Sequence, residues 1–116
     1  MHTEIYARLD RVPPPFRAQA EARVRRSLRR WKRRLTKVRV FLRDENGPRG
    51  GLDTRCRLVL ETERSGSIVT TALSSDAEGA LREALARART RLGRWSERHT
   101  GRARARALRR DLPDAA

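Results

Sequence analysis

The chain has 116 residues, with 29 lysines and arginines against 14 acidic residues, and its formal net charge is +15. This length suits one domain with one modest core, and the single cysteine, Cys56, excludes an internal disulfide scaffold and a cysteine-based zinc site. The N-terminus shows no apolar signal region and no stretch approaches about 20 apolar residues, so the sequence predicts a cytoplasmic protein without a membrane span.

The positive excess indicates a polyanionic partner. Self-repulsion of this size opposes compaction unless a polyanion neutralises it, and nucleic acid is the first candidate, with an anionic membrane surface second. Lys32 and Lys37 are the only lysines, so almost all of the positive charge comes from arginine. Arginine holds phosphate bidentately and stacks on bases. A GC-rich genome explains the preference for arginine over lysine, but it does not explain the size of the charge.

The first two predicted elements are a strand and a helix. Residues 3–9 alternate loosely between apolar and polar, which is typical of a short strand, and Pro13-Pro14-Pro15 ends it. Residues 16–34 predict a helix, because apolar residues recur at steps of three or four. This stripe consists of Ala20, Val24, Leu28, Trp31 and Leu35. Arginines recur at similar steps on the opposite side, where like charges weaken an isolated helix by a few tenths of a kcal/mol each.

Three strands are predicted next, over residues 37–43, 55–63 and 67–73. The first two alternate clearly, which places Val38, Val40, Leu42, Cys56, Leu58 and Leu60 on the buried face. The pattern of residues 67–73 leaves the inward face open. Tyr6 and Phe41 fall on the side opposite the apolar face, where they would either stack on bases or lie partly covered on the sheet.

A second helix follows, with Ser74 or Ser75 as its cap and Asp76 and Glu78 in its first turn. Its apolar positions are Leu81, Ala84, Leu85, Ala88, Leu92 and Trp95. The pattern ends at Gly101. We therefore expect a folded domain over residues 1–100 and a mobile arginine-rich tail over 101–116, which becomes helical when bound.

The predicted order is strand, helix, three strands, helix. Each helix has one apolar stripe and the strands share one apolar face, so the economical packing places both helices on one face of a four-stranded mixed sheet. The fold class is therefore α+β, of the order β-α-β-β-β-α, similar in layout to double-stranded-RNA-binding domains.

One loop resembles a known signature. The run Asn46-Gly47-Pro48-Arg49-Gly50-Gly51-Leu52-Asp53, with Cys56 leading into the next strand, resembles the ribosome hibernation-promoting factor family, which includes ribosome-associated inhibitor A (protein Y). Both helix patterns agree with that family, and the likeness covers about residues 3–98. The chain departs from the family pattern at Thr54, Glu78, Ala88 and Thr90. It resembles the short form, which lacks a second, dimerising domain.

The resemblance implies a hibernation factor of stress and stationary phase in bacteria. Such a protein binds the small ribosomal subunit through its rRNA, and it also binds whole ribosomes. It occludes the path of messenger and transfer RNA. It needs no cofactor, acts on no small molecule and no membrane, and is monomeric away from the ribosome. Basic residues of the two helices face rRNA, whose folded form is recognised through shape and backbone.

The candidate RNA-binding residues come from both helices and from the tip of the loop. They are Arg23, Arg26, Arg30, Arg33, Arg82, Arg87, Arg91, Arg94 and Arg49. The competing interpretation of the helices is a solvated arginine face. For the loop, backbone N–H groups would cradle phosphate, or it is a plain connection.

Two other functions remain as alternatives. The first is a double-stranded-RNA or general nucleic-acid binder without ribosome specificity, and the second is a protein-interaction or membrane-surface module that uses the arginine-rich helix. An enzyme is not predicted, because neither His2 nor His99 is tied by a motif to Cys56. We predict no metal site, because no metal-ligand spacing is present. Trp31 and Trp95 fit core packing better than base stacking.

Overall fold

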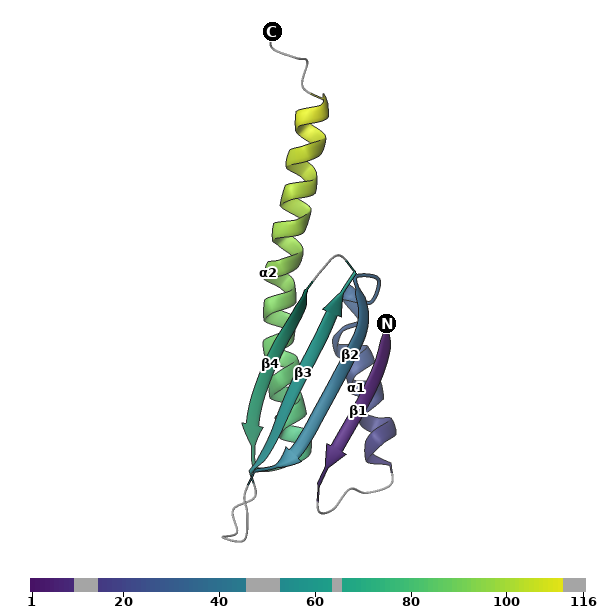
Figure 1. Ribbon diagram of the computed structural model, residues 1–116, viewed down its shortest axis with the longest axis vertical. Helices are drawn as coiled ribbons and strands as arrows, with labels where there is room; N and C mark the ends of the chain where they lie inside the picture. The colour runs from purple at the N-terminus through teal and green to yellow at the C-terminus, as the bar shows by residue number, and fades with distance from the viewer. Residues whose placement is uncertain (10–14, 46–52, 64–65, 112–116) are drawn as a thin grey trace.

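A computed structural model of the chain describes residues 1–9, 15–45, 53–63 and 66–111, with side chains as far as residue 98 (Figure 1). The elements in chain order are β1 (His2–Arg8), α1 (Phe16–Ser27), the 3-10 turn η1 (Arg29–Trp31), β2 (Leu35–Asp44), β3 (Thr54–Thr62), β4 (Ser67–Ser74) and α2 (Ala77–Asp111). This confirms the predicted α+β class and the order β-α-β-β-β-α.

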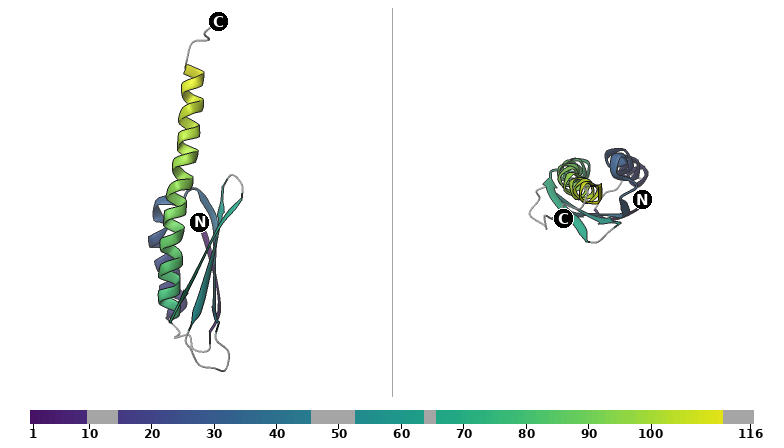
Figure 2. Two further views of the ribbon diagram at one scale, coloured as in Figure 1. Left: turned by 90° about the vertical axis from the view of Figure 1, so that its left-hand side faces the viewer. Right: turned by 90° about the horizontal axis from the view of Figure 1, so that it is seen from above.

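The four strands form one mixed sheet in the order β1-β2-β3-β4. β1 pairs with β2 in parallel, and the other two pairs are antiparallel. Both helices lie on the same face of this sheet, as predicted, and none of the described residues forms a helix on the opposite face (Figure 2). The sheet therefore has one face that builds the core and one face that is open to ligands.

The core lies between the sheet and the two helices. All six strand residues predicted to point inward are buried, from Val38 on β2 to Leu60 on β3. For β4 the structure decides what the sequence left open, since Ile68, Thr70 and Ala72 face the core. These three residues fit an unusually small helix surface, because α2 presents Ala80, Ala84 and Ala88, all buried, at four-residue steps. The hydroxyl of buried Thr70 donates to the carbonyl of Ala84 at 3.0 Å.

The first helix is shorter than predicted, because α1 ends at Ser27 and the chain continues as the tighter turn η1. Trp31 N–H donates to the carbonyl of Leu28, and Arg34 N–H donates to that of Trp31, so i→i+3 bonds replace the α-helical pattern. This tightening reverses the chain so that β2 can begin at Leu35.

The second helix is longer than predicted, because α2 continues past Gly101 to Asp111. Its free end extends beyond the sheet (Figure 1). Within the part of the chain that the structure describes, neither helix has the length and apolar content needed to cross a bilayer. The boundary between a domain over 1–100 and a mobile tail over 101–116 stays a prediction.

The cap of α2 is Asp76, whereas we had predicted Ser74 or Ser75. The Asp76 carboxylate accepts a hydrogen bond of 2.6 Å from the N–H of Gly79, three residues into the helix. A β-carbon at Gly79 would lie 2.9 Å from that carboxylate oxygen and 2.4 Å from the Ser74 hydroxyl. Glycine at this position therefore leaves the space in which the cap forms.

Removing this cap is expected to destabilise the protein modestly. The change Asp76→Ala should lower the free energy of unfolding by about 1 kcal/mol, because the first turn of α2 loses the acceptor for an N–H group. Asp76→Asn keeps a side-chain acceptor and should lose clearly less. Urea unfolding followed by circular dichroism measures both changes, and equal losses would show that Asp76 does not act as a cap.

Candidate nucleic-acid interface

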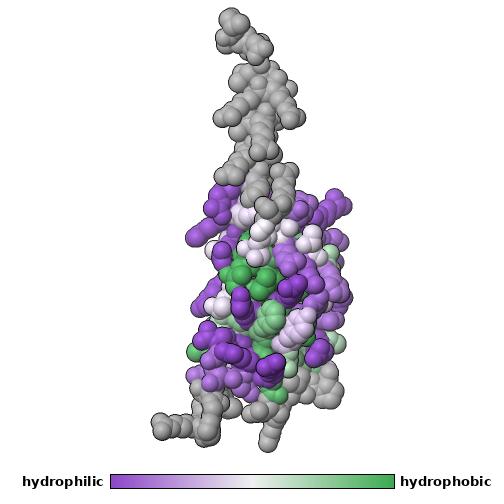
Figure 3. Space-filling model, in the orientation of Figure 1, coloured by the Kyte–Doolittle hydropathy of each residue, from purple (hydrophilic) through white to green (hydrophobic). Residues whose placement is uncertain are grey.

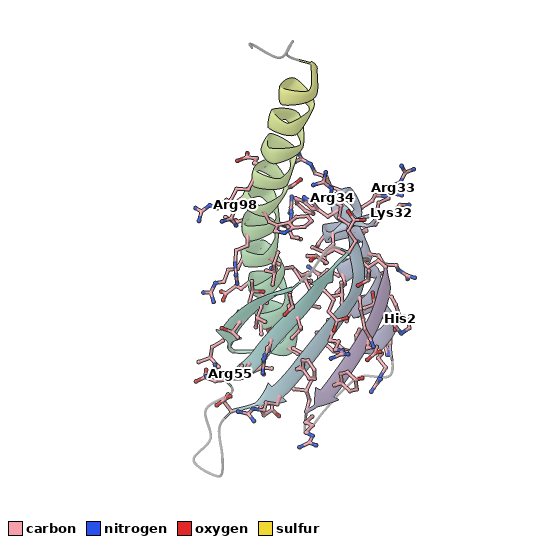
Figure 4. The ribbon with its side chains drawn as sticks, turned by 45° about the horizontal axis from the view of Figure 1, so that its top comes forward. His2, Lys32, Arg33, Arg34, Arg55 and Arg98 are labelled. Atoms are coloured by element: carbon pink, nitrogen blue, oxygen red, sulfur yellow. The ribbon has the colours of Figure 1, made fainter. Side chains whose placement is uncertain are left out.

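The arginine-rich surfaces of the two helices meet near one end of the domain. The turn after η1 is fixed to α2 there, because Arg34 Nη1 donates to the Ser96 hydroxyl at 3.1 Å. The Arg34 guanidinium also lies 5.6 Å from the centre of the Trp95 ring, a cation–π distance. Figure 4 shows Arg34 beside α2, with Lys32 and Arg33 farther from the helix and Arg98 on its other side.

Two shallow hollows lie on either side of this part of α2. The first has a volume of about 340 Å³ and is lined by Arg29, Arg30, Trp31, Lys32, Arg33, Arg34 and Ser96. The second has a volume of about 440 Å³ and is lined by Ile68, Arg91, Arg94, Trp95, Glu97 and Arg98. We call these residues together the basic end of the domain. Their linings contain eight cationic side chains and one acid, Glu97, so the basic end attracts anions.

Four of the predicted residues belong to the basic end: Arg30 and Arg33 in the first hollow, and Arg91 and Arg94 in the second. Arg30 also lies over Trp31, with 5.7 Å from the guanidinium carbon to the ring centre. Arg26 in the last turn of α1 and Arg82 in the first half of α2 are exposed but line neither hollow. The structure thus concentrates half of the helical candidates at one place.

Arg23 has a partner within the protein. Its guanidinium forms a salt bridge of 2.9 Å with Glu78 near the start of α2, which links the two helices. Glu78 is one of the positions where the chain departs from the family pattern. Exposed pairs of this kind contribute at most about 1 kcal/mol, so the link orients Arg23 more than it stabilises the fold. Arg49 lies outside the described residues, so its predicted role is untested.

Arg87 and Arg91 also have structural contacts. β4 is an edge strand, and carbonyl groups on the free side of an edge strand lack a strand partner. The Arg87 guanidinium donates to the carbonyl of Thr71, and the Arg91 guanidinium donates to that of Val69. The two side chains therefore protect the edge of the sheet. An arginine has five N–H donors, so each can still bind phosphate.

Four cationic members of the basic end were not among the predicted residues, namely Arg29, Lys32, Arg34 and Arg98. A continuous helix over 16–34 would distribute the run from Arg29 to Arg34 around its whole circumference. The 3-10 turn gathers the same residues into one hollow instead. The density of cations in this run was the available signal, because it holds five cations in six residues.

The described side chains that line the basic end include no cysteine and no histidine. Cys56 is buried in the core on β3, and burial raises the pKa of its thiol to about 12. Within the described ranges, no group of three or more His, Cys, Asp or Glu residues could hold a metal ion. The side chains present suit the binding of a polyanion through charge and hydrogen bonds.

The burial of Cys56 predicts an unreactive thiol. At pH 8 the native protein should react with a disulfide reagent such as Ellman's reagent far more slowly than the urea-unfolded protein does. The reason is that a thiol with a pKa of about 12 is almost wholly protonated at this pH. Rapid reaction of the folded protein would contradict both the burial and the assignment of Cys56 to the core.

Comparison with known proteins gives similarity at the level of structure. No protein-family model matches the sequence, and no curated protein matches it significantly. A ribosomal subunit interface protein from Coxiella burnetii shares the fold at a TM-score of 0.65 and 15% identity, over 83% of this chain and 98% of that one. The N-terminal domain of Protein Y from Thermus thermophilus does so at a TM-score of 0.63 and 16% identity, over 82% and 99%. The chain therefore shares the fold of these two proteins, which confirms the structural side of the resemblance seen in the sequence.

Proposed function

We propose that this chain is a ribosome-associated factor that binds the small subunit through rRNA. In this proposal the folded domain occupies the path of messenger and transfer RNA, and it inhibits translation in idle ribosomes in the cytoplasm of a bacterium. The basic end is the observation that carries the proposal, because eight cations converge there on a fold shared with a ribosomal subunit interface protein and with the N-terminal domain of Protein Y.

The proposed contacts are arginine–phosphate pairs. They give affinity without reading sequence, and the affinity falls as salt rises because bound counterions are released. Arginine suits this role because its planar guanidinium holds a phosphate through two parallel hydrogen bonds. The shallow hollows fit the backbone of folded RNA better than they fit a small molecule, because neither is enclosed.

Inhibition would result from steric occlusion by the folded domain rather than from a chemical reaction. A domain that fills the RNA path prevents messenger and transfer RNA from entering it, and no bond is made or broken. The protein would act stoichiometrically, with one copy for each small subunit and without a cofactor. Most of the affinity would then reside in contacts that Arg30, Arg33, Arg91 and Arg94 make to the walls of that path.

Sedimentation with purified ribosomal subunits tests this proposal. The protein should travel with small subunits and with whole ribosomes at close to one copy each, and an excess of duplex RNA should fail to displace it. Raising the salt concentration should release it.

Displacement by duplex RNA, or binding that increases without saturation, would reject ribosome specificity. The chain would then be a general double-stranded-RNA or nucleic-acid binder. Flotation with anionic liposomes separates the membrane-surface alternative, for which the protein would rise with the vesicles.

A further inference from the structure

The helix-free face of the sheet carries a second, chemically different surface. Every second residue of each strand points toward this face, and the strand register places it beside a residue of the neighbouring strand. The side chains therefore form rows across the four strands. The central row is Tyr6, Phe41, Arg57 and Thr71. On one side lies the row of Arg8, Arg43, Arg55 and Leu73, and on the other side lies that of Glu4, Arg39, Val59 and Val69.

This face carries an aromatic pair over β1 and β2 and an apolar pair over β3 and β4. The rings of Tyr6 and Phe41 stack with centres 5.1 Å apart and planes inclined by 13°. Although they touch, the two residues remain 49% and 37% exposed. Val59 and Val69 lie beside each other in the next row. Figure 3, which views this face, shows the apolar patch surrounded by hydrophilic side chains.

The Tyr6 ring is fixed in place. Its hydroxyl donates to the Glu4 carboxylate, which also forms a salt bridge of 2.7 Å with Lys37. The hydrogen bonds from Lys37 and Tyr6 lower the pKa of Glu4 to about 2, so Glu4 remains ionised at neutral pH. β1 is an edge strand, so no further strand lies beyond Tyr6. A planar group can therefore extend the aromatic stack at this edge.

Positive charge surrounds the aromatic pair. Arg43 and Arg55 share Glu45, at 3.1 and 2.6 Å, and Arg39 pairs with Glu61 at 3.5 Å. Arg57, next to Phe41, and Arg8, at the end of the adjacent row, form no salt bridge with any residue that the structure describes. The whole face forms a shallow concavity of about 970 Å³. The face thus offers aromatic rings over β1 and β2, with the guanidinium groups of Arg57 and Arg8 in the same row and in the adjacent row.

We propose that this sheet face binds an unpaired segment of RNA, whose bases stack on Tyr6 and Phe41 and whose phosphates pair with Arg57 and Arg8. Single-stranded nucleic acid is commonly held in this way, by aromatic side chains for the bases and cations for the backbone. The inference does not depend on binding to the ribosome. It gives the domain two separate RNA surfaces, the basic end for folded RNA and the sheet face for a single strand.

Charge and geometry favour this occupant over the alternatives. A second copy of the chain would bring another net charge of +15 to a face that is already cationic. A duplex hides the faces of its bases inside its own stack, so it cannot use the aromatic pair. An acidic peptide satisfies the arginines, but it brings no planar groups to the rings.

The test compares two ten-nucleotide strands that have the same phosphates, one of oligouridine and one that is abasic throughout. Binding of the full chain is measured by fluorescence anisotropy at moderate salt. The wild-type protein should bind oligouridine about tenfold or more tightly than the abasic strand, because each stacked base contributes about five- to a hundredfold in affinity. Tyr6→Ala with Phe41→Ala should abolish this preference.

Three control variants separate stacking from charge and from folding. Leu73→Ala removes an apolar side chain of similar exposure on the same face, 46%, and should keep the preference. Tyr6→Phe keeps the aromatic ring and should also keep the preference for oligouridine. This variant therefore tests the proposal even where the double alanine variant does not fold. Arg57→Gln should weaken binding of both strands by the same factor.

Several outcomes would overturn the inference. One is a wild-type protein that binds both strands equally, and another is a base preference that survives folded Tyr6→Ala with Phe41→Ala. A third outcome concerns competition for the labelled oligouridine. If polyglutamate of equal charge displaces it as effectively as unlabelled oligouridine does, the partner would be an acidic protein. The double alanine variant should still co-sediment with small subunits, so this proposal and the ribosome proposal can fail separately.

Discussion

Reversing the charge of Arg26 and Arg30 is expected to lower the affinity of the chain for small ribosomal subunits by about a hundredfold. Arg26 lies exposed in the last turn of α1, and Arg30 lines the first basic hollow. Each charge-assisted contact contributes about 1.5 kcal/mol or more, and two of them give the hundredfold change. Co-sedimentation with subunits measures the loss for the variant Arg26→Glu with Arg30→Glu.

A matched pair of variants separates local contacts from total charge. Arg26→Gln with Arg30→Gln lowers the net charge by two, and Ala18→Glu with Gln19→Glu lowers it equally at exposed positions of the first turn of α1. Acids are favourable there because they face the positive end of the helix dipole. The glutamine variant should flatten the slope of log affinity against log salt by roughly 1.5 to 2.

The control pair should leave that slope almost unchanged, because it removes no phosphate contact. Equal weakening by both pairs would show that only the net charge matters. A charge-reversed protein that is folded and still co-sediments normally would reject the assignment of this part of the surface.

The second large effect is expected from Trp31→Ala. Trp31 is 7% exposed and belongs to the core, and deleting a buried tryptophan side chain costs about 3–5 kcal/mol because a cavity is left. The free energy of unfolding should fall by that amount in urea denaturation. The first basic hollow also loses part of its lining, so subunit binding should weaken even under conditions where the variant is folded.

Trp95→Ala is the natural control, because both tryptophans lie under an arginine but they differ in burial. Each has an arginine over its ring, at 5.7 and 5.6 Å, but Trp95 is only partly buried against the core. Its removal should therefore destabilise the protein clearly less. Equal losses would mean that the cation–π contacts, rather than burial, determine the contribution of both residues.

Most of the fold could be predicted from the sequence, because period-two alternation fixes the inward face of a strand. Val38 and Leu58 were assigned to the core on this basis and are fully buried. The same argument fails for β4, where Ile68, Val69 and Thr70 are all β-branched and either face could pack. The result matters for function, because the outward face of β4 supplies Val69 to the apolar patch.

The candidate site was less predictable, because it depends on where the first helix ends. No proline or glycine marks Ser27, and the apolar stripe continues through Trp31 to Leu35. The i→i+3 bonds of η1 keep these residues in the core while turning the chain. The site residues Arg87 and Arg91 raise a different difficulty, since their contacts with the edge of β4 arise only from tertiary packing. A sequence pattern shows that they are cationic and exposed, but it cannot show that they also protect a strand.

The length of α2 has a mechanical consequence. At about 1.5 Å per residue, its 35 residues span roughly 52 Å, and the segment after Gly101 continues the helix that seats Ala84 and Ala88 on the sheet. The C-terminal part of α2 therefore moves together with the part of the helix that packs on the sheet. The helix continues for 23 residues past Ala88, which is roughly 34 Å, so a tilt of about 10° at the sheet would move its far end sideways by roughly 6 Å. In the proposed complex, the orientation of the domain would therefore decide which part of the partner the end of α2 can reach.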